Sequence, residues 1–375
     1  MTTNILVTGG AGFIGSHTID LLLEHGYKVR ILDNLASPVH IDGNLPDYIS
    51  TEVDFVQGDV RDKDAWESAL DNIDSVFHLA AYQDYLPDFS TFFHVNTVGT
   101  ALLYETIVEQ GLSISKVVLA SSQAIYGEGK YECELHGVQY PPSRSEQQLE
   151  EKQWEPLCPV CEGKLDLLDT SEMHVNPHNS YAMSKYTQEM MGMVLGRRYN
   201  IPTVGMRYSI VQGARQSFRN AYSGVLRIFA MQALAGGPLT AYEDGDQIRD
   251  YVNVIDVARA NMMVLEDARA DFRSFNVGGG RKVTVNEFGN IMAKTVDVPD
   301  IKVVSEGEYR FGDTRHIVSD ISQIGDIGWV PQGTVEMSVQ EYLEWAQKQS
   351  DFGDYATSAR SDMRALGTVR GVRRA

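Results

Sequence analysis

The sequence has few cysteines and no long apolar run, and each shortage excludes a class of protein. Only three cysteines occur among 375 residues, an odd number too small for a disulfide-held scaffold. No stretch approaches the roughly 18 consecutive apolar residues that a transmembrane helix requires. The first residues show no secretory signal. We therefore expect a cytoplasmic protein that does not associate with membranes.

Positive charge is also scarce. The chain carries 32 lysines and arginines against 51 acidic residues, for a formal net charge of −19 at pH 7. Nucleic-acid binding needs clustered positive charge, so no nucleic-acid partner is expected. One small basic pocket for a phosphorylated ligand remains compatible with this total. The length and the 43% hydrophobic content allow a large core and two domains.

Apolar strand patterns alternate with helical patterns in the first half of the chain. Strands are expected at residues 5–8, 28–33, 53–58, 75–81 and 116–122, with helices at 13–25, 63–70 and 98–110. This alternation predicts an α/β fold of the Rossmann type, in which helices cover both faces of a doubly wound parallel sheet. The first domain is expected to span residues 1–205.

The pattern changes after this alternation. Residues 128–173 contain all three cysteines and many charges, which predicts a loop-rich insertion before a long helix at 179–199 and a strand at 203–208. Residues 206–349 predict a smaller, mixed α/β domain. Residues 350–375 are polar and arginine-rich, and they predict a flexible tail that is a candidate for binding anions or a partner.

Residues 8–15 read TGGAGFIG, directly after a strand and at the start of a helix. Gly9 allows a tight turn, Gly12 lets a pyrophosphate approach the backbone, and Gly15 lets helix and strand pack closely. The helix N-terminus offers its free N–H groups to phosphates. These glycines alone also fit a structural turn, but Asp33 ends the next strand, where it can bond an adenosine ribose and repel a 2′-phosphate. The sequence therefore predicts bound NAD rather than NADP.

Three polar side chains are candidates for proton transfer. Tyr181 and Lys185 lie four residues apart near the start of the long helix, and so on one face of it. A free tyrosine has a pKa of about 10, and a lysine ammonium and a positive nicotinamide both favour the phenolate. Ser122 ends the fifth strand, at the edge where ligands of such sheets bind. Each has an ordinary alternative, a surface pair or a strand cap, and only their combination with the dinucleotide motif indicates catalysis.

Further motifs accompany these residues: LDN, GDVRD, HLAA, VNTVGT, SSQAIYG, YAMSK, RDYVNVIDVA, FNVGGG and RFGDTRH. With them, residues 4–347 resemble the extended short-chain dehydrogenase/reductases of the NAD-dependent sugar-nucleotide epimerase/dehydratase family. The resemblance implies Ser122, Tyr181 and Lys185 as catalytic residues, with Asn96 supporting them.

The same resemblance implies the binding residues. NAD contacts are expected from Gly9, Gly12, Phe13, Ile14, Gly15, Asp33, Asn34, Asp59, Val60, Leu79, Ala80, Ala81, Tyr181 and Lys185. For Asp59, which follows the third strand, a simple strand cap is the alternative. Substrate contacts are expected from Gln83, Ser122, Gln123, Tyr181, Arg249, Arg310 and Asp313, with the two arginines placed to clamp a diphosphate.

The residues after Ser122 discriminate between reactions. The 4,6-dehydratases of this family carry Asp-Glu there and the related decarboxylases keep a glutamate, whereas this chain has Gln123-Ala124. Neither side chain transfers a proton at neutral pH, so neither reaction is expected. The prediction is a 4-epimerase that inverts C4 of a dTDP- or UDP-hexose through a 4-keto intermediate. The alternatives are an NAD(P)H-dependent 4-keto-sugar reductase and a catalytically silent NAD-binding protein.

Two segments bear on the substrate. The overall pattern, with its cysteine-containing insertion, is most similar to the dTDP-L-rhamnose 4-epimerase group. Ile210 replaces the asparagine that usually helps such epimerases to hold the substrate. Residues 82–90 are unusual, and Gln83, Asp84 and Tyr85 are expected to face the sugar.

The cysteines have metal-ligand spacing. Cys133-x-x-His136 and Cys158-x-x-Cys161 offer three thiolates and one imidazole, a set that suits tetrahedral zinc. With four protein ligands the metal would be structural, and it would supply folding energy to a loop with little core of its own. Free thiols beside a surface histidine, or a disulfide between Cys158 and Cys161, are the alternatives.

The long helix is rich in methionine, at Met183, Met190, Met191 and Met193. Members of the family pair such helices, so the chain is expected to form a homodimer. Packing of this face within its own chain is the alternative.

Overall fold

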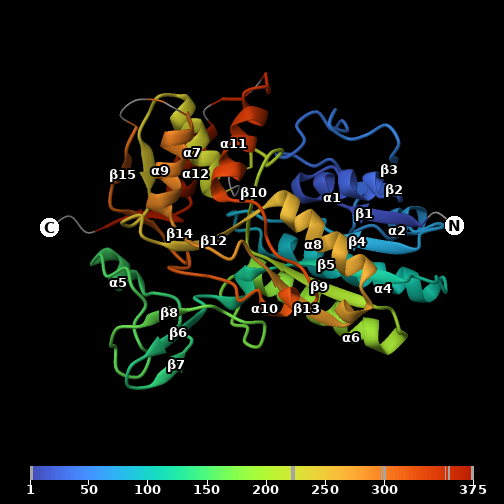
Figure 1. Cartoon of the computed structure of the whole chain (residues 1–375), viewed down its shortest axis with the longest axis horizontal. Helices are drawn as coiled ribbons and strands as arrows, with labels where there is room; N and C mark the ends of the chain where they lie inside the picture. Colours follow the sequence, from blue (N-terminus) through green and yellow to red (C-terminus); the bar gives the residue numbers. More distant parts are fainter. Residues whose placement is uncertain are drawn as a thin grey trace.

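The computed structural model describes residues 3–220, 224–296, 298, 301–350, 352–353 and 355–372. Figure 1 shows a sheet with helices on both faces, a smaller helical part packed against it, and an insertion that projects beside that smaller part. Within the described residues, no helix combines the length and the apolar character needed to cross a lipid bilayer.

A seven-stranded parallel sheet is the centre of the larger part. Its strand order is β13-β9-β5-β4-β1-β2-β3, and neighbouring strands pair in parallel throughout. The strands are β1 (Asn4–Thr8), β2 (Lys28–Asp33), β3 (Asp54–Gln57), β4 (Ser75–His78), β5 (Lys116–Ser122), β9 (Thr203–Tyr208) and β13 (Arg273–Val277). The predicted Rossmann-type fold is confirmed.

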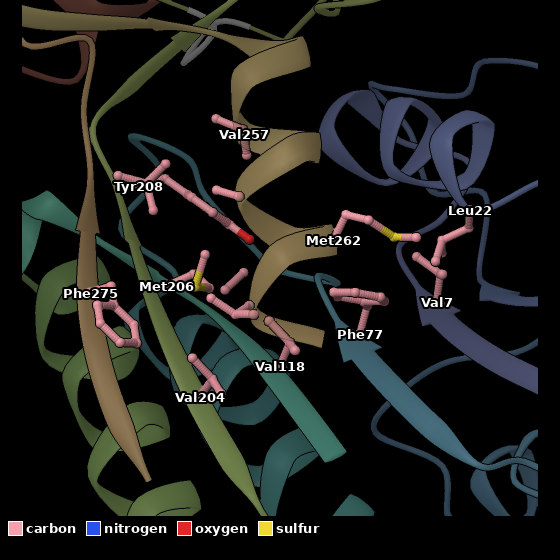
Figure 2. Packing of buried hydrophobic residues seen from close by; sticks show 14 of the residues in the cluster. Val7, Leu22, Phe77, Val118, Val204, Met206, Tyr208, Val257, Met262 and Phe275 are labelled. Atoms are coloured by element: carbon pink, nitrogen blue, oxygen red, sulfur yellow. The ribbon is translucent and has the colours of Figure 1, made fainter. Parts of the chain in front are cut away.

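Helices cover both faces of this sheet because successive strand residues point to opposite sides. Val7 packs with the helices α1 (Phe13–Glu24), α8 (Val254–Glu266) and α10 (Ser322–Gly325), and Leu6 packs with those on the other face, α2 (Lys63–Ala69), α4 (Gly99–Glu109) and α6 (Ser180–Tyr199). Figure 2 shows Leu22 of α1 and Met262 of α8 directed at Val7 and Phe77 of the strands. A short helix α3 (Phe89–Phe92) and a π-helix η1 (Phe93–Val98) lead into α4.

The predicted domain boundary at residue 205 needs correction. Strand β9 runs across it, and the chain later returns to the large sheet with α8, the turn η3 (Ala268–Ala270) and β13. The apolar face of α8 is complementary to α1 and the sheet, so these residues belong to the first core although they lie in the range predicted for the second domain. A single boundary residue cannot separate the two parts, because the chain enters the smaller part and then returns to the large sheet.

The smaller part has its own core. Phe229, Phe288 and Tyr342 are buried at its centre. Its main helices are α7 (Gly224–Leu234), α9 (Val285–Val296) and α11 (Val335–Ala346), and its strands are β10 (Ile210–Gln212), β11 (Leu239–Ala241), β12 (Ile248–Asn253), β14 (Lys282–Thr284) and β15 (Val303–Ser305).

The insertion contains only short elements. Its strands pair antiparallel in the order β7-β6-β8. The elements are β6 (Lys130–Cys133), β7 (Gly137–Gln139), α5 (Glu146–Glu150) and β8 (Asp166–Leu168). Its buried apolar core consists of Tyr131, Cys133, Cys158 and Leu165, with Leu167 packed against them.

The expectation of a flexible tail is wrong for residues 355–372. They form helix α12 (Tyr355–Ala365) and strand β17 (Val369–Gly371), which pairs antiparallel with β16 (Glu308–Arg310). Arg360 and Arg364 form ion pairs with Glu308. These acidic partners lie far away in the sequence, which is why the composition of the tail alone suggested mobility. Residues 373–375 of the predicted tail lie outside the described residues.

Candidate functional site

A large cavity lies at the carboxyl ends of the central strands, and residues of both the larger and the smaller part line it. Its volume is about 770 Å³. Ligands of doubly wound sheets bind at this edge. Every residue predicted to bind NAD or substrate lines the cavity, from Gly9 in the first strand–helix turn to Asp313 near the end of the smaller part.

The glycine turn has the backbone geometry of a phosphate cradle. Gly9 has φ +66°, and a Cβ atom there would lie 2.8 Å from the backbone of Ala80. Gly12 precedes the first turn of α1, where the helix presents N–H groups to the cavity. A Cβ atom at Gly12 would lie 3.2 Å from the carbonyl oxygen of Gly9, so both glycines keep the turn tight against its own backbone. A tight glycine turn that leads into a helix N-terminus fits the pyrophosphate of a dinucleotide.

Asp33 lies at the end of β2 and is almost buried. Its carboxylate accepts hydrogen bonds from the N–H groups of Ala11, at 3.1 Å, and Leu35, at 2.9 Å. Burial raises its pKa above the ordinary range for aspartate. Asp33 therefore anchors the glycine turn besides lining the cavity, a contact that the sequence pattern does not indicate.

A second group of polar side chains lines the cavity next to Asp33. Asn34 donates to the carboxylate of Asp59 at 2.9 Å, and Arg61 bonds the same carboxylate through its guanidinium. The hydrogen bonds from Arg61 lower the pKa of Asp59 to about 2. A strand cap alone does not account for Asp59. Its carboxylate also holds the side chains of Asn34 and Arg61 at the edge of the cavity.

The three candidate proton-transfer residues line one cavity. Ser122 ends β5, and its hydroxyl accepts from the N–H of Ala124 at 3.1 Å at the start of the short helix η2 (Gln123–Tyr126). Tyr181 lies in the first turn of α6, and Lys185 follows one turn later. The Lys185 ammonium donates to Gln188 at 2.8 Å. Burial lowers the pKa of Lys185 to about 7.

Asn96, which is expected to support the catalytic residues, lies behind the cavity wall. It is fully buried in the π-helix η1 and is absent from the cavity lining. Its amide bonds both backbone groups of Tyr82, at 2.9 and 3.1 Å, and the hydroxyl of Ser184, at 2.9 Å. Asn96 therefore joins the loop after β4 to helix α6 from behind the cavity, and any role it has is in positioning.

The predicted arginines lie at the other end of the cavity. Arg310 is held between two aromatic rings, with its guanidinium carbon 5.1 Å from the centre of the Tyr85 ring and 4.7 Å from that of Tyr242. It also donates to the hydroxyl of Tyr85 at 2.6 Å, and its closest approach to Asp313 is 3.9 Å. Such cation–π contacts fix the guanidinium in place.

Arg249 is held differently. It donates to the carbonyl oxygens of Ile248, Thr314 and Arg315, at 3.1, 2.8 and 2.8 Å. All three acceptors are neutral carbonyl oxygens, so these bonds do not neutralise the positive charge of Arg249. An arginine fixed in this way can attract an anion in the cavity.

Some cavity residues carry no signal in the sequence. Tyr242 and Gln247 come from the smaller part, and no motif marks them. Among the described residues, no hydrogen-bond partner is found for the buried Oε1 atoms of Gln123 and Gln247. Buried polar atoms are usually paired, so these oxygens are candidates for sugar hydroxyls. Ile210 lines the cavity too and offers only apolar contact.

The insertion brings its four predicted metal ligands together. Their donor atoms all lie within 4.8 Å of one another. The Sγ atom of Cys133 is 3.6 Å from Nδ1 of His136 and 3.8 Å from Sγ of Cys161, and Sγ of Cys158 is 3.7 Å from the same Nδ1. The three cysteines form no disulfide in this structure.

Comparison with known proteins gives consistent results. Residues 5–146 and 162–278 match the NAD dependent epimerase/dehydratase family. The chain is 30% identical over 354 residues to dTDP-L-rhamnose 4-epimerase of Burkholderia thailandensis, covering 92% of this chain and 96% of that protein. Among solved structures it is similar to UDP-glucose 4-epimerase of Thermotoga maritima with UDP-glucose, with a TM-score of 0.75 and 28% identity over 92% of this chain and 99% of that one. The NAD complex of UDP-glucose 4-epimerase from Thermus thermophilus has a TM-score of 0.71 at the same identity and coverage.

Proposed function

This chain belongs to the NAD-dependent epimerase/dehydratase family, and from that membership we propose that it is an NAD-dependent 4-epimerase of a nucleotide-diphosphate sugar. One observation carries the proposal. Ser122, Tyr181 and Lys185 line the same cavity as the dinucleotide turn, while the residues next to Ser122 are Gln123 and Ala124, which lack a carboxyl group. The site can therefore move a proton at one hydroxyl of the sugar. It has no acid beside Ser122 to protonate and expel a second hydroxyl group, as a dehydratase must.

The roles of the three residues follow from their chemistry. Tyr181 takes the proton from the C4 hydroxyl, and Lys185, one turn along the same helix face, stabilises the phenolate. The Ser122 hydroxyl accepts a bond from Ala124, which leaves its own proton to donate to the sugar oxygen. NAD, when bound, supplies the acceptor and then the donor of the hydride at C4. Tyr181 returns the proton once the 4-keto sugar has presented its other face.

The cavity also suggests which cofactor and substrate are used. The buried carboxyl of Asp33 at the ribose end would repel a 2′-phosphate, which supports NAD over NADP. Arg310 and Arg249 are proposed to bind the diphosphate of a dTDP- or UDP-hexose. Gln83 and Gln123 are proposed to bind sugar hydroxyls. The apolar side chain of Ile210 favours a hexose with a deoxy or otherwise less polar position nearby.

Turnover of sugar nucleotides without added reduced cofactor tests this function. The purified enzyme, incubated with dTDP- and UDP-hexoses and followed by NMR, is expected to give the C4-inverted product with no net change in absorbance at 340 nm. Turnover that requires added NADH or NADPH would instead identify a 4-keto-sugar reductase. Binding of NAD without turnover of any sugar would identify a catalytically silent protein.

We also propose one structural zinc ion, at Cys133, His136, Cys158 and Cys161. Tetrahedral zinc with Zn–S bonds of about 2.3 Å separates its sulfurs by about 3.8 Å, and its sulfur and nitrogen ligands by about 3.6 Å. The distances of 3.8 Å between two sulfurs, and of 3.6 and 3.7 Å from sulfur to Nδ1, fit this geometry. Four protein ligands leave no open position, which supports a structural role.

A homodimer is proposed through helix α6. Met183, Met190 and Val194 are exposed and lie seven and four residues apart, so they share one face, whereas Met193 is buried within the chain. A second copy suits this stripe, because a two-fold axis lets the same apolar face meet itself. Light scattering is expected to give a dimer for the natural sequence and a monomer for Val194→Glu. A monomeric natural protein would contradict the proposal.

A further inference from the structure

The insertion, residues 128–173, contacts the cavity wall mainly at one loop. None of its residues lines the cavity, although all of them are described. They contact the 313–316 loop, which comes after β16 and does line the cavity through Asp313 and Thr314. The contribution of the insertion to substrate binding is therefore indirect, and this loop carries most of it.

Four insertion side chains bond the loop. Glu128 accepts from the N–H of Arg315 at 2.7 Å, and Glu155 accepts from its guanidinium at 2.6 Å. Arg144 donates to the carbonyl of Asp313 at 2.9 Å, and the Tyr131 hydroxyl donates to the carbonyl of His316 at 3.4 Å. The side chains of Glu128 and Arg144 are only 2% and 1% exposed. Buried charges are costly unless paired, so these contacts leave the loop little freedom.

The loop in turn holds Arg249. Two guanidinium N–H groups of Arg249 donate to the carbonyls of Thr314 and Arg315, each at 2.8 Å. The position of this guanidinium in the cavity wall therefore follows the position of the loop. Arg144 adds a second link, since it forms paired 2.9 Å bonds with Glu243, another cavity residue.

The part of the insertion that carries these contacts is not stabilised by a large apolar core. Glu155 lies three residues before Cys158, within residues 147–161, a segment that the family match leaves out. Four buried residues form the apolar core of the insertion, and two of them, Cys133 and Cys158, are ligands in the proposed zinc site. A bound metal joins the β6–β7 hairpin to the 158–161 turn and supplies the missing folding energy.

We infer that the insertion, whose segments are joined by a zinc ion, holds the diphosphate end of the cavity in place. We call this role of the insertion the brace. The metal fixes the segments that carry Tyr131 and Glu155, and these segments, which bond His316 and Arg315, fix the 313–316 loop and so Arg249. The inference rests on the proposed function in naming the diphosphate of a nucleotide sugar as the ligand of Arg249. Glu128, Arg144 and Glu155 are positioning residues and do not touch the substrate.

Metal analysis and binding of dTDP and UDP test the brace without requiring turnover. Protein purified without chelator is expected to contain about one zinc per chain by elemental analysis. His136→Gln should lose the zinc and weaken dTDP and UDP binding about tenfold. Glu155→Gln should keep the zinc and weaken binding to a similar degree. Affinity for NAD, which binds at the other end of the cavity, should stay within about twofold in both variants.

The matched control is His25→Gln, which changes an exposed histidine at the end of α1 and should alter neither zinc content nor affinity. Hydrogen exchange at the N–H of Arg315 should speed up in both test variants. Absence of zinc from the natural protein would overturn the proposal that a metal ion joins the segments of the insertion. Unchanged dTDP and UDP affinity in Glu155→Gln would overturn the brace, even if His136→Gln fails to fold. Diphosphate binding without turnover of any sugar would overturn the proposed function alone.

Discussion

Replacing Tyr181 with phenylalanine is expected to lower kcat for C4 inversion by roughly 10²- to 10⁴-fold, the usual contribution of a positioned acid–base group. The substitution removes one hydroxyl and keeps the ring, whose edge faces Phe92 with the ring centres 6.5 Å apart. The helix and the glycine turn are untouched. We therefore expect the variant to fold and to retain NAD, so that the loss is confined to proton transfer.

Initial rates measured by NMR with the best sugar nucleotide, alongside the NAD content of the purified protein, check this result. Tyr186→Phe is the matched control, because Tyr186 lies on the same helix but does not line the cavity. It should keep natural activity. An active Tyr181→Phe variant would show that Tyr181 is not the proton-transfer residue. If the variant is purified without NAD, its loss of activity is explained by the missing cofactor, which contradicts the expectation that the variant retains NAD.

Gly15→Ala is expected to abolish tight cofactor binding. A Cβ atom at Gly15 would lie 2.4 Å from the carbonyl oxygen of Gly9 and 2.7 Å from the Cα atom of Gly10. Both are backbone atoms of the turn proposed to bind the NAD phosphates, so the turn itself must move. We expect NAD affinity to fall by at least about tenfold, about 1.4 kcal/mol, and the melting temperature to fall by roughly 2–8 °C through overpacking.

Calorimetric titration with NAD and thermal unfolding measure the two effects. Gly325→Ala is the control, since a Cβ atom there would meet nothing within 4 Å and the residue lies in the last turn of α10. It should change neither quantity appreciably. A Gly15→Ala variant that binds NAD as the natural chain does would show that the turn tolerates the displacement.

Local patterns predicted most of the large sheet. Strands β2 and β5 occupy the residues expected for them, 28–33 and 116–122. Their apolar runs end at turn-forming residues, and burial on both faces imposes the same pattern in any such sheet. The fourth strand ends at His78, earlier than expected, because residues 79–81 form the wall of the cavity.

Long-range contacts explain the errors. Helix α8 and β13 pack into the core of the large sheet, although about fifty residues of the smaller part precede them in the chain. The periodicity of apolar residues shows that a helix has an apolar face, but not which core that face packs against. The tail similarly looked mobile because its arginines have few acidic neighbours in sequence. Their partners Glu306 and Glu308 lie more than 50 residues earlier.

The sequence by itself determined the dinucleotide motif and the spacing of Tyr181 and Lys185, because the geometry of each is local. A turn between strand and helix places Gly9, Gly12 and Gly15, and one helical turn separates Tyr181 from Lys185. It also determined the four metal-ligand candidates, which fall in two short spacings. Only the tertiary structure decided what surrounds them. The placement of Arg310 between two tyrosines, and of Arg249 on a loop held by the insertion, depends on contacts between segments far apart in the chain. Burial and charge pairing select such contacts in three dimensions, and no spacing along the chain records them.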